Sequence, residues 1–226
     1  MDIFDLPKTS VPIAGTDDRF PVRRIYCIGR NYEKHVAEMG YDVKRSKPFY
    51  FAKPADAVVQ SGSIVDYPSR TNNLHHEIEL VVAIGKAGRD IPAESALDHV
   101  YGYAVGIDLT RRDLQRTAKE KARPWETAKG FDHSAPISAI HRAEDIGHPS
   151  DGRIWLAVNG VVRQEAGINE LIWTVAESVA ELSTLFEVAP GDLLYTGTPA
   201  GVGPLVPGDE VTGGIEGIDA IRIALR

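Results

Sequence analysis

The sequence predicts a β-rich α+β fold, and three features of the chain support this prediction. Short apolar runs separated by proline and glycine follow one another along most of the 226 residues, a pattern typical of strands joined by turns. Residues 153–167 contain an Asn-Gly pair between two apolar runs, which is the strongest short signal for a β-hairpin. One long segment, residues 171–186, has the 3.6-residue apolar spacing of an amphipathic helix.

Length and composition indicate one large domain. A chain of this length with 43% hydrophobic residues can bury a sizeable core. We expect residues 22–226 to form a single domain, because residues 1–21 combine Pro, Gly, Asp and Thr without a clear period. Residues 1–21 are therefore predicted to be a leader or a short edge element.

Charge and apolar patterning exclude several classes of partner. The formal net charge is −7 and the basic residues are scattered, so nucleic acid is not an expected partner. The first residues lack the pattern of a secretory signal, and no run approaches the ~18 apolar residues of a membrane span. The lone cysteine, Cys27, lies in an apolar run and is expected to be a small buried residue. Together these features predict a soluble cytoplasmic protein.

The first half of the chain alternates short strands with short helices. Residues 23–29 read as a strand that ends at Gly29, and residues 31–40 as a helix with Gly40 as its C-cap. Two strand candidates bounded by proline follow, at residues 47–54 and 61–68.

Residues 77–85 predict a strand that is apolar on both faces beyond its first residues, and therefore buried. A short helix and a strand ending at Asp108 come next. Thr110 followed by Asp113 resembles a capping box that would open a helix.

The second half predicts the hairpin at Asn159-Gly160, the amphipathic helix, and then strands and loops in the Gly- and Pro-rich residues 188–225.

Three carboxylates stand at the ends of the predicted strands. Glu77 and Glu79 are two positions apart, so their side chains share one face of a strand. Asp108 can reach them from a neighbouring strand. Carboxylate oxygens are hard ligands that suit Mg²⁺, Mn²⁺ or Ca²⁺ better than Zn²⁺. The spacing alone leaves two interpretations open: a divalent cation site, or two glutamates at a solvated strand end with Asp108 opening a turn.

Two histidine motifs accompany these carboxylates. His75 and His76 are adjacent, so on a strand they point to opposite faces, and no cysteine completes a zinc site. We expect them to pack or hydrogen-bond behind the carboxylates. His35 and Glu38 lie three residues apart on one helix face, where a carboxylate can orient an imidazole that activates water. A simple surface pair remains the alternative.

Further polar residues mark two loops. Lys129 follows Pro124 and Trp125, which could place its ammonium beside a developing oxyanion; an exposed loop lysine is the alternative. Arg30 follows a predicted strand, and Thr196 and Thr198 lie in a Gly-rich loop whose amides could meet an anion. This loop lacks the Gly-Lys-Ser/Thr ending of a P-loop.

Taken in order, eight motifs resemble the fumarylacetoacetate hydrolase superfamily, and within it the short acylpyruvate and fumarylpyruvate hydrolase branch. The resemblance runs from about Arg24 to the C-terminus and rests on the segments IGRNY, HVAEM, FAKP, HHEIEL, YAVGIDLTRRDLQ, PWETAKGFD, VNGVVRQ and YTGTPAGVG. It implies a mixed β-sheet rolled into a flattened barrel with short peripheral helices, usually assembled as a homodimer.

The resemblance also implies a role for each candidate residue. It makes Glu77, Glu79 and Asp108 ligands of Mg²⁺ or Mn²⁺, and it makes His35 with Glu38 a water-activating dyad on a short lid helix. Lys129 becomes the partner of an enolate oxygen. The residues implied to line the substrate site are Arg30, Arg112, Gln115 and Thr198.

The activity implied by the resemblance is hydrolysis of the C–C bond of acylpyruvates, 2,4-dioxo acids such as fumarylpyruvate, to pyruvate and a carboxylic acid. Such enzymes serve the catabolism of aromatic compounds. An oxaloacetate decarboxylase, or a related 2-oxo acid isomerase or hydratase, would use the same metal site and is the first alternative. A non-catalytic metabolite- or cation-binding β protein is the second. The His35–Glu38 pair favours hydrolysis, because decarboxylation needs no water nucleophile.

Overall fold

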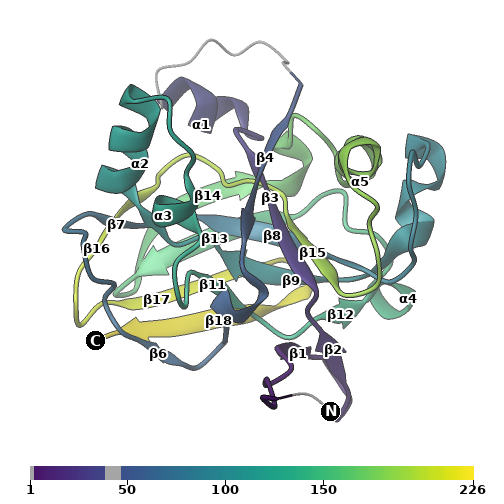
Figure 1. Ribbon diagram of the computed structural model, residues 1–226, viewed down its shortest axis with the longest axis horizontal. Helices are drawn as coiled ribbons and strands as arrows, with labels where there is room; N and C mark the ends of the chain where they lie inside the picture. Colours follow the sequence, from purple (N-terminus) through teal and green to yellow (C-terminus); the bar gives the residue numbers. More distant parts are fainter. Residues whose placement is uncertain (1–2, 39–46) are drawn as a thin grey trace.

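Two β-sheets packed face to face form the centre of the computed structural model, which describes residues 3–38 and 47–226 (Figure 1). Within these residues the larger sheet has the strand order β4-β3-β15-β8-β9-β11-β5, with β12 paired to β9. The second sheet has the order β14-β13-β17-β18-β6. Parallel and antiparallel pairs occur in both sheets. The predicted β-rich fold, a mixed sheet rolled into a flattened barrel, is confirmed.

The strands are short, as the spacing of proline and glycine predicts. In the first half of the described chain they are β1 (Ser10–Pro12), β2 (Arg19–Pro21), β3 (Arg24–Gly29), β4 (Phe49–Lys53), β5 (Val58–Gln60), β6 (Ile64–Val65), β7 (Leu74–His76), β8 (Ile78–Ile84) and β9 (Val100–Ile107). In the second half they are β10 (Thr110–Arg111), β11 (Ala135–Ile137), β12 (His141–Arg142), β13 (Arg153–Val158), β14 (Val161–Gly167), β15 (Asp192–Tyr195), β16 (Gly203–Leu205), β17 (Glu210–Ile215) and β18 (Ile218–Leu225).

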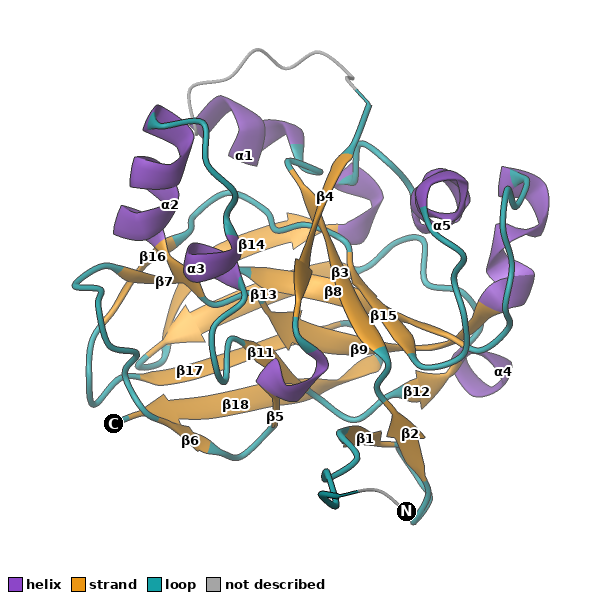
Figure 2. Ribbon diagram, viewed as in Figure 1, coloured by secondary structure: helices purple, strands orange, loops and turns teal. Residues whose placement is uncertain are grey.

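The helices lie around the sheets rather than between them (Figure 2). The α-helices of the described residues are α1 (Glu33–Glu38), α2 (Arg112–Glu120), α3 (Glu126–Lys129), α4 (Ala143–Ile146) and α5 (Val175–Leu185). Three short 3₁₀ helices are η1 (Ala55–Ala57), η2 (Ala93–His99) and η3 (Ile168–Glu170). In this described part of the chain no helix combines the length and apolarity needed to cross a membrane.

Strand β8 is buried along its whole length and separates two apolar clusters. Alternate residues such as Ile78 and Leu80 belong to the main core, which they share with β13, β17 and β18 of the second sheet. Val81 and Ala83 belong to the other cluster, together with Cys27 of β3. The strand therefore has one face for each cluster, as its sequence pattern predicts, and Cys27 is buried as expected.

The Asn-Gly hairpin forms as predicted. Strands β13 and β14 pair antiparallel from Arg153↔Gly167 to Val158↔Val161. Asn159 and Gly160 have φ values of 51° and 78°, and positive φ at both central positions defines the type I′ turn that matches the twist of the two strands.

The predicted capping box at Thr110 is wrong. Helix α2 begins at Arg112, and Thr110 belongs to β10, which pairs with β7. Instead of capping the helix, the Thr110 hydroxyl donates to the Asp108 carbonyl at 3.1 Å. The Asp113 carboxylate accepts from the Thr71 hydroxyl, so it fastens α2 to the loop before β7.

The long amphipathic segment begins its helix later than predicted. Helix α5 starts at Val175 because Thr174 and Glu177 form a reciprocal capping box. The preceding Trp173 bonds with Asn31: its backbone N–H donates to Asn31 Oδ1 at 2.7 Å.

Residues 10–21 contain a β-hairpin, because β1 and β2 pair antiparallel. Val11 and Phe20 of this hairpin are buried in the second apolar cluster. The division of the chain at residue 22 stays a prediction. The proposed C-cap Gly40 lies outside the described residues.

Candidate active site

One pocket brings together nearly all of the predicted site residues, from segments far apart in the sequence. Residues of α1, α2 and α3 line it, at the end of the strands that carry the carboxylates. Figure 1 shows these three helices on the same side of the molecule. Of the residues predicted from the sequence, it is lined by Arg30, His35, Glu77, Glu79, Asp108, Arg112, Gln115, Lys129 and Thr198. Glu38 is not among the lining residues.

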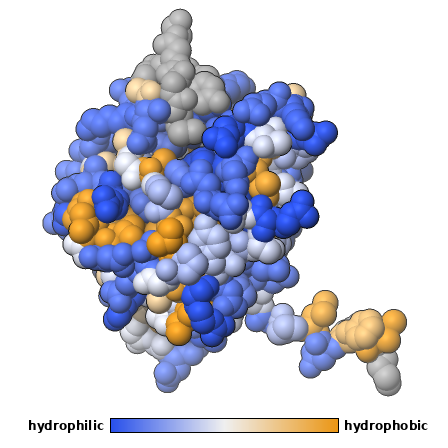
Figure 3. Space-filling view, turned by 90° about the vertical axis from the view of Figure 1, so that its left-hand side faces the viewer, coloured by the Kyte–Doolittle hydropathy of each residue, from blue (hydrophilic) through white to orange (hydrophobic). Residues whose placement is uncertain are grey.

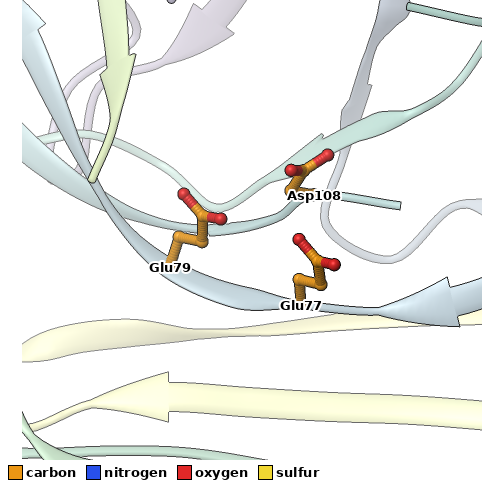
Figure 4. Close-up of side chains that lie close together, drawn as sticks. All are labelled: Glu77, Glu79 and Asp108. Atoms are coloured by element: carbon orange, nitrogen blue, oxygen red, sulfur yellow. The ribbon is translucent and has the colours of Figure 1, made fainter. Parts of the chain in front are cut away.

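The three carboxylates lie together because β8 and β9 are neighbours in antiparallel register. Ile78 pairs with Ile107, which sets Glu77 beside Asp108, and the Asp108 backbone N–H donates to the Glu77 carbonyl at 2.8 Å. Oxygen atoms of Glu77, Glu79 and Asp108 all lie within 4.8 Å of one another (Figure 4). The three residues are 4%, 2% and 0% exposed, which rules out the alternative of a solvated strand end.

Buried cations balance two of these carboxylates. Lys129 Nζ donates to Glu77 Oε2 at 2.7 Å and also to Asp108 Oδ2. Lys53 Nζ lies 2.8 Å from Asp108 Oδ1, and Arg112 donates to Glu77 Oε1. Burial opposes the ionisation of Glu77, but Lys129 and Arg112 outweigh it and hold the pKa of Glu77 well below its usual range.

Glu79 is in the opposite electrostatic situation. Burial, and then the charges of Asp108 and Glu77, raise the pKa of Glu79 well above its usual range. Its Oε2 accepts a hydrogen bond from the Gly197 backbone N–H at 2.8 Å. A divalent cation among the three carboxylates would supply the positive charge that Glu79 needs, so this donor set fits Mg²⁺ or Mn²⁺.

The predicted His-Glu pair forms on α1. His35 Nδ1 lies 3.3 Å from Glu38 Oε2, and His35 is buried and lines the pocket. The Glu38 carboxylate also accepts from the Gly201 backbone N–H at 3.2 Å. Burial lowers the pKa of His35 below its usual value, although Glu77 and Glu38 oppose this shift. This shift favours the neutral imidazole, the state in which it can take a proton.

Helix α2 presents one face to the pocket. Arg112, Gln115 and Lys119 are spaced three and four residues apart, the spacing of one helix face. Arg112 Nη1 donates to Gln115 Oε1 at 2.6 Å. Sequence reasoning missed Lys119, although its distance from Arg112 and Gln115 along the helix was a signal that could have found it.

Aromatic rings form part of the pocket lining. The rings of Phe49 and Trp125 meet edge to face at 5.3 Å. The guanidinium of Arg30 lies 5.4 Å from the centre of the Phe49 ring, and Lys119 Nζ lies 5.1 Å from that of Trp125. Burial, together with the positive charges of Arg112 and Arg30, lowers the pKa of Lys119 to about 8.

The remaining candidates have supporting positions. Thr196 donates its hydroxyl to the Leu80 carbonyl at 2.9 Å and does not line the pocket. His76 is buried and its Nδ1 lies 2.9 Å from Gln164 Oε1. His75 accepts a hydrogen bond from Arg112 Nε at 3.4 Å. Both histidines thus lie behind the carboxylates rather than among them, as the sequence predicts.

Comparisons with known proteins show the family of this chain. The family model described as fumarylacetoacetate (FAA) hydrolase C-terminal matches residues 24–226. A fumarylpyruvate hydrolase of Ralstonia sp is 45% identical over 189 residues, which is 83% of this chain and 98% of the relative. The mitochondrial oxaloacetate tautomerase FAHD1 of Mus musculus is 43% identical over 204 residues, 90% of this chain and 92% of the relative.

A solved structure is similar over the whole length. The crystal structure of fumarylpyruvate hydrolase from Pseudomonas aeruginosa, in complex with Mn²⁺ and pyruvate, has a TM-score of 0.97 and 51% sequence identity, and the match covers 100% of this chain and 99% of that one. Because the family model spans nearly all of the chain and the relatives are similar over most of it, this chain belongs to the fumarylacetoacetate hydrolase family.

Proposed function

We propose that this chain is a divalent-metal-dependent hydrolase that cleaves the C–C bond of acylpyruvates and releases pyruvate and a carboxylic acid. One observation carries the proposal: three buried carboxylates and a buried histidine line the same pocket. The similarity to a fumarylpyruvate hydrolase with bound Mn²⁺ and pyruvate supports it.

Glu77, Glu79 and Asp108 are the proposed ligands of Mg²⁺ or Mn²⁺. When bound, the cation would hold the carboxylate and 2-oxo oxygens of the substrate and draw electrons from the bond to be broken. Arg112 fixes the Glu77 carboxylate from the side of α2, and the Gly197 N–H fixes Glu79. These hydrogen bonds orient the carboxylates before a ligand arrives.

The His35–Glu38 dyad is proposed to activate water. Glu38 accepts the hydrogen bond from His35 Nδ1, which leaves Nε2 as the basic nitrogen. His35 Nε2 then takes a proton from water while the water oxygen adds to the distal carbonyl carbon of the substrate. Burial lowers the pKa of His35 below its usual value, which favours the neutral form that this step requires.

Lys129 is the proposed partner of the leaving enolate. Collapse of the water adduct breaks the C–C bond and releases the carboxylic acid, and the electron pair moves to the 2-oxo oxygen of the pyruvate portion. The proton that His35 took from water then returns to the enolate carbon, which gives pyruvate and restores the neutral imidazole. The Lys129 ammonium lies at this end of the pocket, held by Glu77 and by Thr110 Oγ1 at 2.7 Å. A fixed ammonium stabilises the charge that develops on the enolate oxygen.

The cationic and aromatic part of the pocket lining supports a substrate with a second carboxylate. Arg30 and Lys119 line the pocket against the Phe49 and Trp125 rings. Two cations beside a planar aromatic wall complement an unsaturated, negatively charged acyl group. Fumarylpyruvate, which carries such a group, is therefore the preferred substrate.

A spectroscopic assay tests the central claim. We expect loss of the acylpyruvate ultraviolet absorbance in the presence of Mg²⁺ or Mn²⁺, and no loss after EDTA treatment. Glu79→Gln should reduce turnover strongly at any metal concentration that saturates the native protein. Turnover that persists in EDTA, or a fully active Glu79→Gln variant, would overturn the claim.

Oxaloacetate is the second candidate substrate, because the relative with 43% identity is an oxaloacetate tautomerase. Decarboxylation or tautomerisation of oxaloacetate passes through the same kind of enolate but needs no added water. His35→Ala should therefore abolish acylpyruvate hydrolysis and spare turnover of oxaloacetate. Equal loss of both activities would contradict the roles given to His35 and Lys129.

We further propose that the protein assembles as a homodimer. We also propose that it acts in the cytoplasm, in the catabolism of aromatic compounds. Apolar side chains gather on one face of the molecule, and the N-terminal segment projects from the body (Figure 3). Exposed apolar residues of the described chain include Ile3, Phe4, Val161, Val162 and Val206. Such surfaces are commonly covered by a partner. Sedimentation velocity should show twice the mass of one chain, and Val162→Asp should lower it to one.

A further inference from the structure

Gln164 of β14 is a fully buried amide whose hydrogen-bonding capacity is used completely. Its Oε1 accepts from the Ile78 backbone N–H at 3.1 Å and lies 2.9 Å from His76 Nδ1. Its Nε2 donates to Thr198 Oγ1 at 2.8 Å and to the Pro199 carbonyl at 2.9 Å. Two acceptor sites and two donors are what a side-chain amide offers. This amide therefore joins the start of β8 to the loop after β15.

Two backbone partners fix the orientation of this amide. The Ile78 N–H can only donate, so the atom facing it is the oxygen of Gln164. The Pro199 carbonyl can only accept, so the atom facing it is the nitrogen. The roles of the other two partners follow: His76 Nδ1 donates to Gln164 Oε1, and Thr198 Oγ1 accepts from Gln164 Nε2.

The orientation of this amide determines the direction of the Thr198 hydroxyl proton. Because Thr198 Oγ1 already accepts from Gln164, its own O–H is directed to another acceptor, and Thr198 lines the active-site pocket. We propose that Gln164 is a positioning residue that makes Thr198 a hydrogen-bond donor toward an oxygen of the bound 2-oxo acid. This inference rests on the proposed function for the identity of the ligand.

The same loop is held from its other end, which limits how far Thr198 can move. The Gly201 N–H donates to the Glu38 carboxylate of α1. Gln164 thus fixes the loop from the sheet, and Glu38 fixes it from the helix that carries His35. Gln164 also bonds to the backbone between Glu77 and Glu79 through Ile78, so it relates the position of Thr198 directly to that of the carboxylates.

Gln164→Glu separates the donor role from simple packing. The substitution keeps the shape of the side chain but replaces Nε2 with an oxygen. Whether this carboxyl is ionised or donates its proton to the Pro199 carbonyl, the oxygen facing Thr198 becomes an acceptor and draws the hydroxyl proton away from the pocket. Because a buried carboxyl group can impair folding, Gln164→Met is the second variant. It removes the amide that donates to Thr198 Oγ1, so the direction of the Thr198 hydroxyl is no longer fixed.

The test measures pyruvate binding to the Mn²⁺-loaded protein by calorimetry, for the native chain, Gln164→Glu or Gln164→Met, Thr198→Val, and the double variants. Each single substitution should weaken binding roughly tenfold, the effect expected for a hydrogen bond to a charged acceptor. The double variants should bind as Thr198→Val does. In hydrolysis assays KM should rise more than kcat falls, and Thr198→Ser should behave like the native protein.

Two outcomes would overturn the inference separately from the proposed function. If Gln164→Met weakens binding by the same factor in the Thr198→Val background, Gln164 does not act through Thr198. If ¹⁵N NMR of the native protein shows His76 protonated on Nε2 rather than Nδ1, the amide orientation is wrong. A native protein that binds Mn²⁺ but not pyruvate would overturn the proposed function, and with it the ligand assigned to Thr198.

Discussion

The backbone N–H of Asp108 donates to the carbonyl oxygen of Glu77 at 2.8 Å, so two carboxylates are brought together by the sheet itself. The antiparallel register of β8 and β9 leaves no freedom to separate them. Burial then removes the water that would otherwise screen their charges. The site is therefore electrostatically strained unless cations are present.

Metal binding should stabilise the native protein and not a Glu79→Gln variant. Because the pKa of Glu79 is raised by burial and by Asp108 and Glu77, its ionised form disfavours folding at neutral pH. The neutral glutamine should melt no lower than native protein without metal. Mn²⁺ at one hundred times its dissociation constant should stabilise the native chain by about 2.7 kcal/mol.

Differential scanning fluorimetry with and without Mn²⁺ checks this prediction. Glu165→Gln is the matched control, because Glu165 lies on the exposed side of β14 and pairs with Arg153 at 2.7 Å. The control should keep the native response to Mn²⁺. A full Mn²⁺ response in Glu79→Gln would contradict the assignment of Glu79 as a ligand.

Removing the Lys129 ammonium should destabilise the fold. Lys129→Met leaves the buried carboxylates of Glu77 and Asp108 without a shared cation, a change that typically costs about 3–5 kcal/mol. Urea unfolding at pH 7 measures it. Added Mn²⁺ should recover part of the loss because it restores positive charge, and turnover should stay low. A Lys129→Met variant as stable as native without metal would contradict this account.

The fall in hydrolysis rate at low pH (the acid limb of the pH profile) should reflect protonation of His35. Burial lowers the pKa of His35, so the neutral base persists below the usual value of about 6.5 and activity should fall only under that pH. The bond to Glu38 raises this pKa. Glu38→Gln should therefore move the acid limb to lower pH while reducing kcat by about 10²-fold, as loss of a general base's partner does.

A profile of kcat/KM against pH tests the direction in which Glu38→Gln moves the acid limb. Glu33→Gln serves as the control, because Glu33 is on the same helix but is exposed. It should leave both the limb and the rate unchanged. Movement of the acid limb to higher pH in Glu38→Gln would mean that another group sets it.

Lys119 should couple substrate preference to pH. Its pKa is lowered to about 8, so its positive charge is present below that pH and is lost as the pH rises through it. The KM for a dicarboxylate such as fumarylpyruvate should rise above pH 8, while the KM for an acylpyruvate with a neutral acyl group should not.

Variants of Lys119 test whether its charge causes the pH dependence of the KM for the dicarboxylate. Lys119→Met should lower kcat/KM for the dicarboxylate roughly tenfold, as loss of a charged hydrogen-bond partner does, and should remove the rise in KM. Lys119→Arg should keep the preference and lose the pH dependence, because arginine stays charged. Equal effects on both substrates would show that Lys119 does not recognise the acyl group.

Local patterns in the sequence predicted those parts of the fold that depend on neighbours along the chain. The alternation in β8 reflects burial on both faces, and the Asn159-Gly160 pair specifies a turn by its own backbone preferences. The prediction for Thr110 is wrong because a threonine before a helix can cap it only if its hydroxyl is not engaged elsewhere. Here the hydroxyl accepts from Lys129.

The parts of the site that escaped prediction depend on residues far apart in the sequence. Lys53 reaches Asp108 from the edge of the larger sheet, and no spacing rule connects those two positions. Gln164 contacts Ile78 and Thr198 across the two sheets. In the sequence Gln164 is one polar residue in a hairpin strand. Its buried position between the two sheets depends on the register of β14 against β13 and on how the sheets pack.

The carboxylates and the dyad occupy parts of the molecule with very different tolerance to change. Glu79 lies on the fully buried strand β8, where neighbouring side chains are fixed by two apolar clusters. His35 and Glu38 lie on α1, a six-residue helix at the periphery. Under the proposed mechanism, the activation of water, and so hydrolysis, depends on this short helix. The stabilisation of the enolate depends on residues of the core. Evolution could thus exchange hydrolysis for another enolate reaction by altering one surface helix, without rebuilding the interior.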